Sequence, residues 1–81
     1  MTNEILLQDL TTTWTLLANG YGTYINNGAA NVYVQRNPDA APAALDEGLL
    51  ISQYGSFFVT PEEESKTYVR SATATAKIAK I

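Results

Sequence analysis

The stretch that most constrains the fold of this chain is residues 21–35, which read YGTYINNGAANVYVQ. Two runs rich in β-branched and aromatic residues, which favour strands, flank a segment of asparagine, glycine and alanine. Residues 27–30 then form the loop of a predicted β-hairpin, since asparagine and glycine tolerate turn conformations. The chain is therefore expected to form a small β-sheet domain.

Side chains alternate between the two faces of a strand, so the pairing of the hairpin decides which side chains are buried. With Ile25 opposite Val32, Tyr24 lies opposite Tyr33. The predicted hairpin then buries Ile25, Val32 and Val34 on one face and presents the two tyrosines on the other. The tyrosine face is an expected interaction surface.

The chain has 81 residues, enough for one domain with a core of marginal size. It contains neither cysteine nor histidine, so it has no disulfide and lacks the usual ligands of zinc and iron. Self-association is the remaining common way to stabilise so small a core. We therefore expect a homo-oligomer without a metal or other cofactor.

The net charge of −3 argues against nucleic acid as a partner, because phosphate binding depends on clustered lysine and arginine. Four of the five cations, Lys66, Arg70, Lys77 and Lys80, lie in the last sixteen residues, and most acidic residues precede them. This polarity suits solvated strand faces and also permits head-to-tail contact between subunits. No apolar run reaches the about 18 residues of a membrane span, and the first residues lack the basic region of a secretory signal. We expect neither a membrane partner nor secretion.

Residues 1–11, MTNEILLQDLT, show no clean helix or strand period. One interpretation is an N-terminal apolar arm that packs on another subunit, with residues 12–81 forming a single β-sandwich domain. The other interpretation is a first edge strand of the same sheet. The sequence leaves both open.

Short strand-like segments recur along the rest of the chain and indicate an all-β fold, a small antiparallel sandwich or partly open barrel of six to seven strands. A second hairpin is expected around Ala72 and Thr73. The single tryptophan is expected to anchor the core. The predicted core consists of Trp14, Leu16, Ile25, Val32, Val34, Ile51, Val69, Ala76 and Ile78.

Two segments between the predicted strands have their own character. Residues 36–47, RNPDAAPAALDE, form a long loop, and a loop of this length in a short domain is usually functional or covered by a partner. Residues 60–64, TPEEE, resemble a helix start, but only a single turn fits before the next strand. The three adjacent glutamates lack the ligand spacing and the glycine of a calcium loop, so a solvated turn is the preferred interpretation.

The sequence contains no catalytic motif. Without histidine, a nucleophilic serine would need a lysine or a carboxylate as its base, and no Ser-x-x-Lys pattern occurs. The sequence Gly20-Tyr21-Gly22 is not followed by a helix pattern, which argues against a phosphate-binding loop. We expect a protein that is not an enzyme.

A small carbohydrate-binding module is the alternative function. Tyrosine rings offer stacking faces to sugars and asparagine amides bind hydroxyl groups, although tyrosine is also enriched at protein interfaces. The candidate residues are Tyr21, Tyr24, Tyr33, Tyr54, Tyr68, Asn26, Asn27 and Asn31.

The order of several short motifs resembles that of a known class of proteins. The motifs are WT at 14–15, YIN at 24–26, VYV at 32–34, a proline- and alanine-rich loop up to Gly48, FVT at 58–60, and YVRSA at 68–72 before an alanine, threonine and lysine strand. This order is similar to that of the small β-sandwich structural proteins of tailed bacteriophages. Those proteins decorate capsids or sit in the head-to-tail and tail region, usually as symmetric oligomers. The resemblance spans most of residues 12–81.

The resemblance implies a non-catalytic virion protein that is assembled in the host bacterial cytoplasm. Its implied partners are copies of itself and other virion proteins, and a trimer is favoured because virion sites have threefold symmetry. Apolar surface that one sandwich does not easily cover supplies the expected interface. The interface residues are Ile5, Leu6, Leu7, Leu10, Tyr24 and Tyr33.

Overall fold

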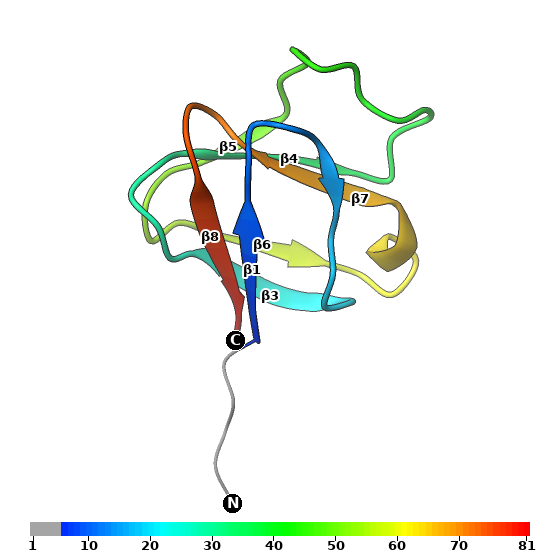
Figure 1. Cartoon of the computed structure of the whole chain (residues 1–81). Helices are drawn as coiled ribbons and strands as arrows, with labels where there is room; N and C mark the ends of the chain where they lie inside the picture. The colour runs from blue at the N-terminus through cyan, green and yellow to red at the C-terminus, as the bar shows by residue number, and fades with distance from the viewer. Residues whose placement is uncertain (1–5) are drawn as a thin grey trace, which may run out of the picture.

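The structure, a computed structural model, describes residues 6–81. Its strands are β1 (Leu6–Leu10), β2 (Thr15–Leu16), β3 (Gly22–Asn26), β4 (Val32–Arg36), β5 (Leu49–Ile51), β6 (Ser56–Val59), β7 (Thr67–Ser71) and β8 (Ala76–Lys80), with one turn of 3-10 helix, η1 (Glu64–Lys66), before β7. Sheet A has the strand order β1-β8-β3-β6 and sheet B the order β2-β7-β4-β5. The two antiparallel sheets pack together in two layers (Figure 1). Within residues 6–81 no helix has the length and apolar character needed to cross a bilayer.

The β-sandwich predicted from the sequence is confirmed, with eight strands instead of six to seven. The additional strand is β1, which lies at the edge of sheet A and pairs with β8 from Leu6 opposite Lys80 to Leu10 opposite Ala76. Residues 6–10 therefore form an edge strand, which is the second of the two interpretations that the sequence left open. Leu10 is fully buried, so this strand contributes to the core.

The chain crosses from one sheet to the other at most connections. Because β3 belongs to sheet A and β4 to sheet B, the hairpin predicted over residues 21–35 is wrong. The hairpin predicted around residues 72 and 73 is wrong for the same reason, since β7 and β8 lie in different sheets. The two crossing loops contact each other: the backbone N–H of Ala72 donates to the carbonyl of Asn31 at 2.9 Å. The two crossings therefore support each other at one end of the sandwich.

The loop of residues 27–31, which we call the first crossing loop, joins β3 to β4 in the other sheet. With this connection, the face of β3 that is buried is the opposite of the predicted one. Tyr24 is fully buried and stacks on Phe57 with the ring centroids 5.3 Å apart, whereas Ile25 faces outward. Val32 and Val34 are buried as predicted. A loop that crosses between layers lets consecutive strands point side chains into one core from opposite sides, which a hairpin within one sheet cannot do. Burying the aromatic pair also removes more apolar area from water than burying Ile25.

Most of the predicted core is confirmed. The buried residues among those predicted are Val32, Val34, Ile51, Val69, Ala76 and Ile78. The prediction that Leu16 is buried is wrong. The alternation around the two-residue strand β2 is offset by one position, so Leu17 is buried instead. The prediction that Trp14 and Ile25 belong to the core is also wrong, because both side chains lie on outer faces of the sandwich. The core residues that the sequence analysis missed are Leu10, Leu17, Tyr24, Phe57 and Val59.

Asn26, the last residue of β3, joins the two layers by hydrogen bonds. Its side chain is fully buried, and its amide nitrogen donates to the carbonyl of Ala30 at 2.8 Å and to that of Ile51 in sheet B at 3.0 Å. Its side-chain oxygen accepts from the N–H of Gly28 at 3.1 Å. Its backbone groups also bond to the turn between β5 and β6. Every polar group of this buried residue is therefore satisfied within the protein.

We expect Asn26→Ala to lower the free energy of unfolding by about 2–4 kcal/mol, because it leaves buried carbonyl and N–H groups without partners. The matched control is Asn27→Ala, which removes an exposed side chain at the next position and should change stability by less than about 0.5 kcal/mol. Urea unfolding followed by Trp14 fluorescence measures both. Equal stability of the two variants would contradict the bridging role of Asn26.

Candidate functional site

Residues 37–48 form a loop on the outer side of sheet B (green in Figure 1). Besides Arg70, three side chains of this face hold the loop. The indole N–H of Trp14 donates to the carbonyl of Ala43 at 2.9 Å, and the hydroxyl of Tyr33 donates to the Glu47 carboxylate at 2.9 Å. The side-chain amide of Gln35 donates to the Glu47 carbonyl at 2.8 Å. The long loop is thus attached to the sheet at both its middle and its end.

Arg70, in β7, is the central residue of this face. Its Nε and Nη2 both donate to the Asp46 carbonyl, at 3.2 and 2.8 Å, and its Nη1 donates to the Ser71 carbonyl at 3.1 Å. The guanidinium carbon lies 5.2 Å from the centroid of the Trp14 ring and 4.7 Å from that of Tyr33. Only 7% of Arg70 is exposed. Two aromatic faces and three hydrogen bonds therefore stabilise a cation that is shielded from water.

Among residues 6–81, no carboxylate forms a salt bridge with Arg70. The one salt bridge in that part of the chain joins Lys77 to Asp9 at 3.6 Å, between two strands of sheet A. The carboxylates of Asp46 and Glu47, although close in sequence, accept hydrogen bonds from other groups. Burying a cation without an anion is costly, so the backbone carbonyls and aromatic rings around Arg70 must offset that cost.

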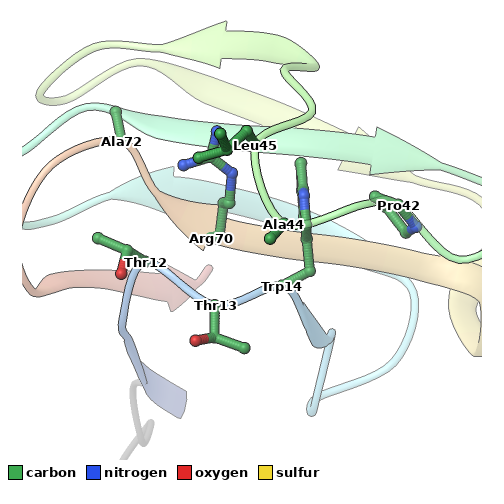
Figure 2. A pocket seen from close by; sticks show the side chains of 8 residues that line it. All are labelled: Thr12, Thr13, Trp14, Pro42, Ala44, Leu45, Arg70 and Ala72. Atoms are coloured by element: carbon green, nitrogen blue, oxygen red, sulfur yellow. The ribbon is translucent and has the colours of Figure 1, made fainter.

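A depression of about 560 Å³ lies beside Arg70. Figure 2 shows the Arg70 side chain next to the Trp14 ring, with Leu45 near the guanidinium group and Pro42 on the other side of the indole. The lining includes Thr12, Thr13, Trp14, Pro42, Leu45 and Arg70. The depression thus combines one buried cation and two hydroxyl groups with a largely apolar rim, which is the composition of a small binding site.

The outer face of sheet A is different, because it carries exposed apolar side chains without a covering loop. Leu7 and Phe58 are both about half-exposed. In the strand register Leu7 lies opposite Ala79, Ala79 opposite Ile25, and Phe58 opposite Thr23, all on the outer face. Neighbours on one face of a sheet contact each other, so Leu7, Ala79, Ile25 and Phe58 form an apolar surface, which the Asp9–Lys77 ion pair borders beside Leu7 and Ala79. We call this the sheet A surface.

The predicted interface residues fall in several places. Leu10 and Tyr24 are buried inside the sandwich, so the expectation that they lie at a surface open to a partner is corrected. Leu6 and Leu7 are 43% and 50% exposed on β1. Ile5 lies outside the described residues. Of the four of these that the structure describes, only Leu7 belongs to the sheet A surface.

The residues proposed for sugar binding are also dispersed. Tyr21 and Tyr54 are 52% and 68% exposed and lie in separate loops, whereas Tyr68 lies in β7 on the outer face of sheet B. Asn27 and Asn31 are exposed in the first crossing loop, and Asn26 is fully buried. The structure does not bring these side chains together into one platform.

The acidic turn before η1 uses its carboxylates locally. Glu63 accepts a hydrogen bond from the N–H of Thr60 at 3.0 Å, and this bond lowers the pKa of Glu63. Glu64 accepts from the N–H of Tyr21 at 3.0 Å. In residues 6–81 no three acidic side chains are grouped so that they could hold a metal ion.

Arg70 and Trp14 were not predicted as parts of a site. Two signals were present. Arg70 is a charged residue inside a strand of apolar and β-branched residues, and the loop of residues 36–47 was expected to be functional or covered. What the sequence did not indicate is that this loop lies against the strand that contains Arg70.

Comparison with known proteins does not extend this description: no protein-family model, curated protein or solved structure matches the chain. The functional assignment therefore depends on the surfaces themselves.

Tyr33, also predicted at the interface, is half-buried beneath the loop. The hydrogen bond to the Glu47 carboxylate raises the pKa of Tyr33 above its ordinary value, and burial raises it further. Because the pKa is higher in the folded protein, the neutral phenol stabilises the fold. That contribution is fully present below the pKa of the unfolded chain, about 10, and is lost as the pH rises through the higher pKa of the folded state.

We therefore expect the stability advantage of the wild type over Tyr33→Phe to be present at about pH 8 and to shrink at about pH 11. Urea unfolding at the two pH values measures the difference. Tyr68→Phe is the control, because it removes a phenol hydroxyl from the same face without touching the Glu47 contact. A Tyr33→Phe difference that grows with pH would contradict the role of the Glu47 contact.

Proposed function

We propose that this chain is a non-catalytic structural subunit of a bacteriophage particle, which decorates the capsid or occupies the head-tail or tail region. It acts by assembling with copies of itself and with other virion proteins, in the cytoplasm of the host bacterium. The resemblance of residues 12–81 to small phage β-sandwich proteins supports this role. The structural observation that supports it best is the sheet A surface.

The sheet A surface favours a second copy as its partner. Leu7, Ile25 and Phe58 lie on three strands of sheet A, and Leu7 and Phe58 belong to β1 and β6, the two edge strands of that sheet among residues 6–81. An open edge strand presents free backbone N–H and C=O groups, which a symmetric assembly removes from solvent. Burying the exposed half of a leucine or phenylalanine contributes about 1 kcal/mol per side chain. We therefore propose a homo-oligomer, with the trimer favoured by the phage resemblance.

The expected result is an oligomeric mass for the full chain in light scattering at tens of micromolar, and a clear shift toward monomer in Leu7→Glu. A charge in an apolar interface should weaken association by at least about tenfold. Leu50→Glu is the matched control, because Leu50 is 51% exposed but lies on the outer face of sheet B. Removing residues 1–11 is a poorer test, since it also removes β1 and the core residue Leu10.

A full-length monomer at that concentration would refute self-assembly. An equal decrease of the oligomeric mass in Leu7→Glu and Leu50→Glu would show that the interface is not specific to the sheet A surface.

The test of the virion role itself is mass spectrometry of purified phage particles from infected cells. We expect the protein in the particles, at a copy number that is a multiple of its oligomeric state. Presence in the cytosol of infected cells together with absence from the particles would reject a structural role in the virion.

A small carbohydrate-binding module is the second candidate. The depression beside Arg70 is the observation in its favour, because Trp14, Thr12 and Thr13 supply a ring and hydroxyl groups at one place. Two features weaken it for neutral sugars. The indole N–H already donates to Ala43, and one face of the ring lies against Arg70. Glycan retention that is lost in a Thr12→Ala and Thr13→Ala double variant of unchanged oligomeric mass would favour this candidate.

A further inference from the structure

We propose that the depression beside Arg70 is a binding site for a carboxylate group carried on a small apolar body. This inference goes beyond the assembly role and does not depend on it, since the depression lies against sheet B and the proposed interface lies on sheet A. It begins from the charge of Arg70. A guanidinium group stays charged at every physiological pH, and Arg70, of which 7% is exposed, lines the depression.

The hydrogen bonds of Arg70 leave part of its binding capacity open. A guanidinium group has five N–H donors. Nε makes one bond, Nη2 one and Nη1 one, all to backbone carbonyls of Asp46 and Ser71. One N–H of each Nη atom therefore remains without a partner among residues 6–81. Each Nη atom thus keeps one charged donor for an acceptor oxygen, and a carboxylate offers two such oxygens.

The surroundings of Arg70 select a singly charged anion. Arg70 is the one cation that lines the depression, and the protein as a whole carries a net charge of −3. A doubly charged phosphate usually needs several cations or a helix N-terminus, and neither is present at this place in the described structure. A carboxylate needs only one guanidinium group for a bidentate contact.

The rim of the depression selects the rest of the ligand. Pro42, Ala44, Leu45 and Ala72 present aliphatic groups, and Trp14 presents part of its ring. Leu45 is 90% exposed, so a bound ligand would cover an apolar side chain that now faces water. Thr12 and Thr13 complete the lining on the side of the chain that leads to Trp14. The rim thus fits a carboxylate attached to an amino-acid-sized or sugar-sized body.

Two sources supply this chemistry: an acidic residue or terminus of a peptide, and an acidic sugar. The single tryptophan gives a reporter that is read without ambiguity, because the chain has one indole N–H resonance. We would titrate the full chain with sodium N-acetylglycinate, as the peptide-like probe, and with sodium glucuronate, as the acidic sugar. N-acetylglycinamide is the neutral match, inorganic phosphate is the competing anion, and sodium chloride keeps the ionic strength constant.

We expect a saturable shift of the Trp14 indole resonance with at least one of the two carboxylates at millimolar concentration, and none with the neutral amide. A response to N-acetylglycinate identifies a peptide carboxylate as sufficient, and a response to glucuronate alone identifies an acidic sugar. Either result supports the site. No saturable response to either carboxylate, or an equal response to phosphate, overturns it and leaves Arg70 as a clamp for the loop.

Variants separate binding from loss of structure. Leu45→Glu places a negative charge at the exposed rim without touching the core, and we expect it to weaken carboxylate binding by about threefold or more through like-charge repulsion. Gln53→Glu makes the same change in net charge at an exposed turn outside the depression and should bind like the wild type. Arg70→Lys keeps the charge but loses the planar fork, and we expect more than about tenfold weaker binding.

Amide spectra that superimpose away from the depression show that each variant is folded. Equal affinities of the wild type, Leu45→Glu and Gln53→Glu would place the anion elsewhere and reject the proposal.

Discussion

The hydrogen bonds of Asn26 are the constraint on which the arrangement of the two layers depends. The residue ends β3 and is fully buried, so each of its polar groups must find a partner inside the protein. Those partners lie in the first crossing loop, in β5, and in the turn that leads to β6. One side chain therefore fixes the point where the chain leaves sheet A and the position of β5, in sheet B, relative to the end of β3. With this point set, Tyr24 and Val32 enter the same core from opposite layers.

The fold class and much of the core follow from the sequence, because alternating β-branched residues indicate strands whatever their partners are. Val32, Val34 and Val69 are examples. The connections do not follow in the same way. A loop of asparagine, glycine and alanine such as residues 27–31 serves equally well to turn a hairpin or to cross between sheets, and the choice depends on contacts with residues far along the chain. The predicted hairpin therefore placed Ile25 in the core and Tyr24 on the outside, which is the reverse of the structure, because a strand shifted by one position exchanges its two faces.

The site was predictable only in outline. The length and composition of the loop indicated a functional or covered segment, and the structure shows that it lies over Arg70. The role of Arg70 and Trp14 was beyond the sequence, because a tryptophan in a small domain is more often a core residue and because no local pattern links positions 14, 33 and 70. These residues meet through the lateral order of strands in sheet B. The side chains of the sheet A surface were missed for a related reason: the face of a strand is known only when its partners are.

The neighbours β1 and β8 come from opposite ends of the described chain, and β8 is also the strand that links β1 to β3. During synthesis on the ribosome, β1 therefore has no partner in its own sheet until β8 has emerged. Pairing over such a distance must offset a large loop-closure entropy before any contact is gained, which slows folding. In that interval Leu10 and the inner face of β3 are open to chaperones and to other nascent copies made from the same message. The arrival of β8 between β1 and β3 is thus the step that closes sheet A and covers this apolar surface.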